Sequence, residues 1–113
     1  MSERDATVSL RHMLDAARRA IELAHGRSRA DLDEQDVVAL ALTRLVEIVG
    51  EASRRVPEDV RRDHAEIPWR QIAGARDRLI HGYDEVDLDI LWNIVTVRLP
   101  ELVQQVEAVL AGD

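Results

Sequence analysis

Residues 33–57, DEQDVVALALTRLVEIVGEASRRVP, decide the fold. Their apolar residues recur at spacings of three and four, which is the period of one face of an α-helix. Asp33 is a good N-cap, and Pro57 ends the helix. Four further apolar residues widen the stripe, so the helix is expected to pack on more than one neighbour. The seam is Val38, Leu42, Leu45, Val49, Ala52 and Val56, and the widening residues are Val37, Leu40, Ala41 and Ile48.

The sequence before residue 33 predicts one long helix and a loop. Residues 2–25 carry apolar side chains on one helical face, and Gly26 stops that helix. Residues 26–33, GRSRADLD, are predicted to be a loop. Within the helix of residues 33–57, Gly50 lies in the apolar seam, which indicates a close approach of another helix.

The sequence after Pro57 predicts three more helices. Residues 57–64 form a short one, and the next begins near Pro68 and frays at Gly82. The last stretch, residues 87–110, keeps one apolar register through Pro100, which favours a kink at the proline, with a break as the alternative. The expected fold is therefore all-α: an antiparallel four-helix bundle with a short extra helix, in a single domain of residues 1–113.

Composition narrows the class of protein. The chain has no Cys, which excludes a disulfide framework and thiolate metal sites. Its net charge of −7 argues against a general nucleic-acid coat protein, although all 15 basic residues are Arg, the better ligand for phosphate. The N-terminus lacks a signal-peptide pattern, and no apolar run is long enough to span a bilayer. We therefore expect a cytoplasmic protein with no membrane partner.

The chemically richest stretch is RDRLIHGY, residues 76–83. Arg76 can neutralise a phosphate, and His81 can move a proton near neutral pH. Together these groups are sufficient for metal-free RNA cleavage through the 2′-hydroxyl. The spacing alone is a weak signal, because Arg followed by His within a few residues occurs often by chance. The alternative for His81 is a helix C-terminal histidine that interacts only with the last carbonyls. We predict neither a metal nor a cofactor, since the other histidines show no ligand spacing: His12, His25 and His64.

The stretch resembles the signature of the HEPN superfamily, which is Arg, four residues, then His. Tyr83, two places further on, matches the narrower HepT-like group. The resemblance extends through IPWRQIAGARDRLIHGYDEVD (67–87), VEIVGEA (46–52) and LPEL (99–102). It covers about residues 8 to 110, and it implies an HEPN-like helical fold.

The resemblance implies a metal-independent ribonuclease toxin of a toxin–antitoxin pair. Arg76 and His81 would be catalytic, and a minimal nucleotidyltransferase antitoxin would adenylylate Tyr83 and silence the nuclease. HEPN proteins are generally dimers with their motifs facing across a cleft, so a homodimer is expected, with the helix of residues 68–83 near the interface. Asp77 departs from the Asn usual after the motif Arg, and it is a supporting residue that would either orient Arg76 or weaken phosphate binding.

Helix geometry leaves two ways to build this site. On an ideal helix Arg76 and Tyr83 share a face, whereas His81 lies about 140° round the axis from Arg76. Either the helix loosens near Gly82, or a second subunit completes the site.

Other polar and aromatic residues receive weaker assignments. Arg70 and Arg78 are surface residues that could also bind RNA, and Trp69 and Trp92 are core or interface anchors. The alternative function is a non-catalytic helical module that docks a nucleotidyltransferase or a nucleic acid.

Overall fold

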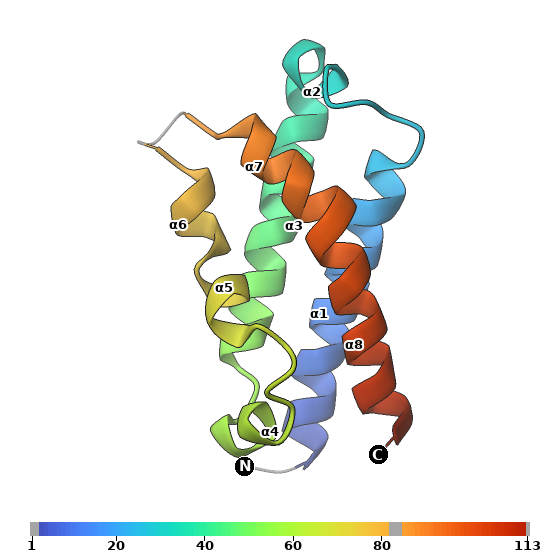
Figure 1. Ribbon diagram of the computed structural model, residues 1–113, viewed down its shortest axis with the longest axis vertical. Coiled ribbons are helices and arrows are strands. Elements are labelled where there is room, and N and C mark those ends of the chain that lie inside the picture. The colour runs from blue at the N-terminus through green and yellow to red at the C-terminus, as the bar shows by residue number, and fades with distance from the viewer. Residues whose placement is uncertain (1–2, 82–84, 113) are drawn as a thin grey trace.

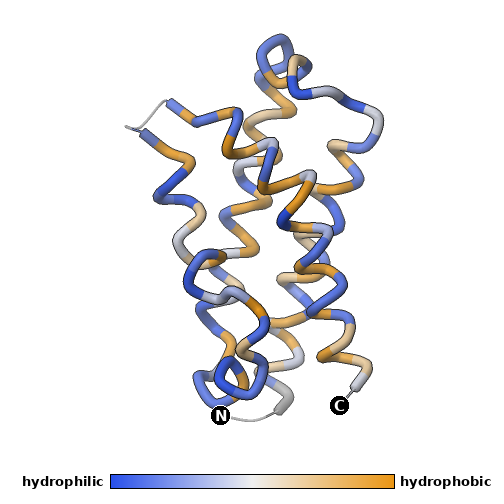
Figure 2. Tube along the Cα trace, in the orientation of Figure 1, coloured by the Kyte–Doolittle hydropathy of each residue, from blue (hydrophilic) through white to orange (hydrophobic). Residues whose placement is uncertain are grey.

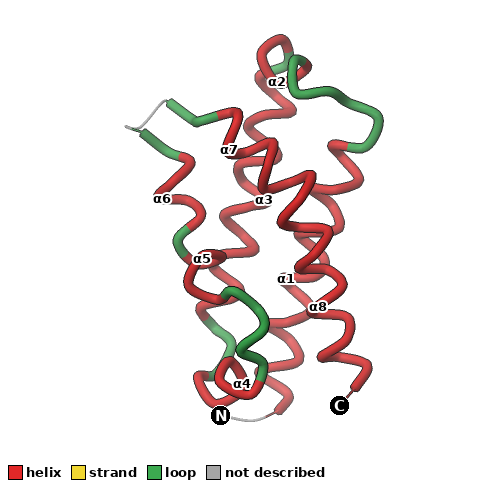
Figure 3. Tube along the Cα trace, in the orientation of Figure 1, coloured by secondary structure: helices red, strands yellow, loops and turns green. Residues whose placement is uncertain are grey.

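The computed structural model describes residues 3–81 and 85–112 and contains helices with no strand in these ranges (Figures 1 and 3). The all-α prediction is therefore confirmed. Three long helical segments form the body of the bundle, and shorter helices join them. The elements are α1 (Glu3–Ala24), α2 (Asp31–Glu34), α3 (Asp36–Arg54), α4 (Glu58–Asp63), α5 (Trp69–Ala73), α6 (Ala75–Leu79), α7 (Leu88–Asn93), η1 (Ile94–Arg98) and α8 (Leu99–Gly112).

The core lies where α1 packs against α3 and α8. The buried core residues are aliphatic and recur at helical spacing. Hydrophobic and hydrophilic positions alternate along the same helices (Figure 2). Every residue of the predicted seam is buried, including Val56, which follows the end of α3. Completely buried side chains come from five of the elements: Met13, Leu42, Leu79, Leu91 and Val106.

The region before α3 differs from the prediction. Asp31–Glu34 forms the short helix α2 where a loop was expected, so Asp33 is not the N-cap of α3. Gln35 holds that position without a side-chain hydrogen bond, and the Asp33 carboxylate instead accepts from Arg29 at 3.1 Å. The widened stripe was also partly wrong. Val37 and Leu40 are 78% and 66% exposed, because nothing in the described chain covers that side of α3.

The expected helix from Pro68 to Gly82 is two short helices. Gly74 separates α5 from α6, and both pack on α3 (Figure 1). Gly50 permits this contact: a Cβ there would lie 3.2 Å from the carbonyl oxygen of Ile72, so the predicted close approach is confirmed. Helix α6 ends at Leu79, before the predicted fraying point, and Ile80 is extended.

The final segment stays helical through Pro100, as predicted. A π-helical turn, η1, precedes the proline, and the backbone N–H of Leu99 donates to the carbonyl of Ile94 five residues earlier. Such a turn accommodates proline because proline brings no N–H to the helical ladder. Among the described residues, no helix is both long and apolar enough to cross a membrane.

Candidate functional site

Arg76 projects from the first turn of α6 toward α3. Its Nε donates to Glu47 Oε2 at 2.8 Å, although the two residues are 29 positions apart in the sequence. The Arg76 side chain is 56% exposed and that of Glu47 is 23% exposed, so this ion pair contributes only about 0–1 kcal/mol to folding. Its main effect is on orientation. Held through Nε, the guanidinium keeps both terminal nitrogens without a hydrogen-bond partner in residues 3–81 and 85–112.

Arg76 lines a groove between α1, α3 and α6 with a volume of about 660 Å³. Arginines outnumber carboxylates among its lining residues, although the chain as a whole is acidic. The groove is therefore a locally basic surface that contains the predicted phosphate ligand. Its charged lining residues are Arg44, Arg54, Arg55 and Arg76 with Glu47, Glu51 and Asp77, and His12 of α1 joins them.

His81 lies outside helix α6, where residues 79–81 pair with residues 85–87 ahead of α7. Ile80 and Val86 form an antiparallel β-bridge, and the backbone N–H of His81 donates to the carbonyl of Glu85 at 2.9 Å. The backbone N–H of Asp87 donates to the carbonyl of Leu79 at 2.7 Å. This pairing brings His81 Nε2 to 3.9 Å from Asp87 Oδ2, a distance longer than a hydrogen bond.

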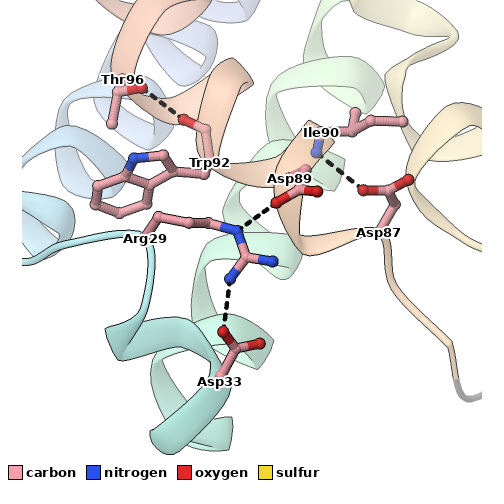
Figure 4. Close-up of polar contacts among 7 residues, drawn as sticks. All are labelled: Arg29, Asp33, Asp87, Asp89, Ile90, Trp92 and Thr96. Atoms are coloured by element: carbon pink, nitrogen blue, oxygen red, sulfur yellow. Dashed lines mark hydrogen bonds and ion pairs between the residues drawn. The ribbon is translucent and has the colours of Figure 1, made fainter.

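The Asp87 carboxylate has a second role at the start of α7. Its Oδ1 accepts from the backbone N–H of Ile90 at 3.0 Å, which is an N-cap contact (Figure 4). The predicted start of the last helix at Asp87 is thus confirmed. Beside it, Asp89 accepts from Arg29 at 2.7 Å, and this hydrogen bond raises the pKa of the Arg29 guanidinium (Figure 4). Arg29 also contacts Asp33, so it ties α2 to α7.

The cap predicts a loss of stability when Asp87 is changed. Asp87→Ala should lower the free energy of unfolding by about 1 kcal/mol, because the first turn of α7 loses its side-chain acceptor. We expect Tm in a thermal melt to fall by roughly 4 °C. Asp87→Asn is the matched control, since Asn caps as well as Asp, and its Tm should stay near that of the wild type. Equal melting of the Ala and Asn variants would contradict the capping role.

With this geometry established, comparison with known proteins identifies the family. Residues 13–109 match the family described as Ribonuclease HepT-like. The chain belongs to the HepT-like ribonuclease family. The enzyme class predicted from the sequence, a ribonuclease, is thereby confirmed, and it is favoured over the alternative of a non-catalytic helical module.

Three relatives illustrate the similarity. A protein of Caldanaerobacter subterraneus subsp. tengcongensis, named as an inferred RNase, is 39% identical over 89% of this chain and 90% of its own length. One from Methanocaldococcus jannaschii, also named as an inferred RNase, is 34% identical over 96% of this chain and all of its own length. An inferred ribonuclease HepT of Thermococcus cleftensis is 50% identical over 55% of this chain and 56% of its own. No solved structure gives a significant match to this one.

The remaining predicted residues of this HepT-like chain are distributed over several surfaces. Asp77 lines the same groove as Arg76. Arg70 lines a different depression, beside Trp69, and Arg78 lies at a third, where its Nη2 donates to the Gln71 carbonyl at 3.3 Å. Tyr83 lies outside the described residues. The structure therefore joins Asp77 to Arg76 and separates Arg70 and Arg78 from it.

The two tryptophans are partly buried, in keeping with their predicted role as anchors. Trp69 Nε1 donates to the carbonyl oxygens of Arg61 and His64 at 3.1 and 3.0 Å, which fixes the connection after α4. Trp92 packs against the core from α7.

Sequence reasoning missed the carboxylates that contact the two motif residues of this HepT-like site. Glu47 lies within VEIVGEA, the segment that resembles the family, but its pairing with Arg76 depends on how α6 crosses α3. Asp87 was recognised as a helix start and not as a neighbour of His81. Its position six residues after His81 is the only signal that the sequence carries.

Proposed function

We propose that this protein is a metal-independent endoribonuclease in which Arg76 and His81 carry the chemistry. His81 takes the proton of a ribose 2′-hydroxyl, and the 2′-oxygen attacks the adjacent phosphorus. The bond from phosphorus to the 5′-oxygen of the next nucleotide breaks, and that oxygen takes up a proton from water. The products are a 2′,3′-cyclic phosphate and a 5′-hydroxyl. Arg76 stabilises the charge that develops on the phosphoryl oxygens.

The observation that supports this role best is the arrangement of Arg76. A guanidinium fixed through Nε presents its two terminal nitrogens, the pair that binds two phosphoryl oxygens at once. It does so from a basic groove on the surface of a chain whose family is that of HepT-like ribonucleases.

The site is proposed to be completed by a second copy of the chain. Within one protomer Arg76 contacts α3 while His81 contacts the start of α7, and the groove that Arg76 lines does not include His81. One side of α3 also leaves Val37 and Leu40 exposed, and those residues continue the side of the helix that carries Arg44. Pairing of two such apolar faces would bury them and bring the Arg76 groove of one protomer near the other protomer.

A mixed dimer tests this arrangement directly. Arg76→Ala and His81→Ala chains carrying different tags are co-expressed, and the heterodimer is purified through both tags. If one site combines Arg76 of one protomer with His81 of the other, the heterodimer retains one intact site, and we expect about half of the wild-type RNA cleavage. Each mutant homodimer serves as an inactive control. An inactive heterodimer would place both residues of a site in the same protomer, and failure to recover any dimer would contradict the homodimer itself.

The biological role that we propose is that of the toxin in a toxin–antitoxin pair, acting in the cytoplasm. A minimal nucleotidyltransferase would be the antitoxin and would transfer AMP to Tyr83. In that reaction the phenolic oxygen attacks the α-phosphorus of ATP, pyrophosphate leaves, and the phenolic proton passes to a base of the transferase. Support for this role comes from the residues of the motif and from membership of the HepT-like family.

A further inference from the structure

The groove beside Arg76 extends well beyond that residue along α3. Four of its lining residues are spaced four, seven and eleven positions from the first: Arg44, Ile48, Glu51 and Arg55. At about 100° per residue, such positions lie within about 60° of one another, so they form a stripe along one side of the helix. Arg44 and Arg55 mark its two ends, about 16 Å apart at 1.5 Å per residue.

Arg76 reaches this stripe between its ends. Glu47, which binds Arg76 Nε, lies one turn after Arg44 and about two turns before Arg55 on the same helix. A single-stranded nucleic acid whose scissile phosphate contacts Arg76 would therefore have α3 beneath its neighbouring nucleotides on both sides. The distance along the helix corresponds to a few nucleotides of backbone.

The charges in the groove are unequally neutralised. Arg76 pairs with Glu47, and Arg54 pairs with Glu51 at 3.1 Å and donates to the carbonyl of Ala73 at 2.7 Å. Arg44 and Arg55 are exposed and have no ion-pair partner among the residues that the structure describes. The two guanidinium groups at the ends of the stripe are thus available for anions.

We propose that this groove is the RNA-binding track of the enzyme, in which Arg44 and Arg55 bind the backbone phosphates that flank the scissile one. The proposal rests on the proposed ribonuclease function, and it adds the contacts that hold the strand. Because these contacts are to phosphates, they confer affinity without base preference. Glu51 lowers the positive charge of the track through its pairing with Arg54.

The test measures binding apart from cleavage. The full-length protein is titrated with a short single-stranded RNA whose 2′-hydroxyls are methylated, so that it cannot be cut, over a range of salt concentrations. Each lost phosphate contact should weaken binding and lower the slope of log K against log salt by about 0.7. We expect that change for Arg44→Ala and for Arg55→Ala, and about twice the change for the double variant.

Two further proteins complete the test: a matched control outside the groove, and a variant that is expected to bind RNA more tightly. Arg62 and Arg98 are exposed arginines outside the groove, and neither has an ion-pair partner in the described chain. The Arg62→Ala/Arg98→Ala protein removes the same net charge and should keep the wild-type slope. Glu51→Gln should bind the RNA more tightly, because it removes a negative charge and releases Arg54.

Three outcomes would overturn the proposal. The first is a double groove variant that binds RNA like the control double variant, and the second is a wild-type protein that does not bind the methylated RNA. The third is a change of oligomeric state alone in the groove variants, which would assign the groove to the contact between copies. Cleavage of ordinary RNA by the wild type, lost in His81→Ala, would in each case leave the ribonuclease function standing.

Discussion

Replacing His81 with alanine is expected to reduce the rate of RNA cleavage by about 10²–10⁴-fold, the usual cost of removing a general acid–base group. Arg76→Ala should reduce it by about 10²–10³-fold, because the developing phosphoryl charge loses its cation. Both side chains are more than half exposed, so their removal should leave Tm nearly unchanged. The measurement is single-turnover cleavage of a labelled RNA in the presence of EDTA.

Two matched substitutions separate the chemistry from a general loss of charge. His25→Ala removes an exposed histidine at the end of α1, and Arg62→Ala removes an exposed arginine in α4. Both variants should cleave at the wild-type rate. If His81→Ala cleaved as fast as His25→Ala, His81 would have no part in the mechanism.

Adenylylation of Tyr83 is expected to abolish cleavage. Tyr83 is two residues from His81 in the sequence. An AMP group attached there carries a phosphodiester anion and a nucleoside into the surroundings of His81. The anion competes with the RNA phosphate for cationic groups, and the nucleoside blocks access. Inhibition then needs no change of conformation elsewhere in the protein.

Intact-mass spectrometry detects the added AMP and so tests this prediction. Co-expression with a cognate nucleotidyltransferase should add one or more AMP units, located on Tyr83 by peptide mapping, and the purified protein should not cut RNA. Tyr83→Phe should keep at least part of the nuclease activity and escape silencing. A fully inhibited complex with unmodified Tyr83 would show that the antitoxin acts by masking the site and not by modification.

The helices that pack in the core were predictable, because the spacing of their apolar residues shows which side of each helix is buried. The seam of α3 and the register of the last segment through Pro100 both follow from spacings of three and four. Boundaries were less predictable. Asp33 is a residue type that often caps helices, but its carboxylate pairs with Arg29. Helix α3 begins at Asp36 instead. That contact depends on where α7 and Asp89 lie, which local sequence does not determine.

In the site, too, some features were predictable from the sequence and others were not. The motif identified Arg76 and His81, but an ideal helix through residue 82 places them on different faces. The structure ends α6 at Leu79, because Ile80 is extended and bridges to Val86. The helix therefore ends three residues before Gly82, but Arg76 and His81 still contact different elements, which is why a second subunit is proposed to complete the site. The pairing of Arg76 with Glu47 is a tertiary contact over 29 residues, and no spacing rule predicts it.

Cleavage through the 2′-hydroxyl is the central claim, and analysis of the products of two matched RNAs tests it most directly. One substrate is ordinary RNA, and the other carries a single 2′-deoxy nucleotide on the 5′ side of the mapped cleavage position. Both are incubated with wild-type protein in EDTA, and the fragment masses are measured. We predict that ordinary RNA yields a 5′ fragment ending in a 2′,3′-cyclic phosphate, and that the deoxy substrate stays intact at that position. Equal cleavage of the two substrates, or cleavage that EDTA abolishes, would contradict the mechanism.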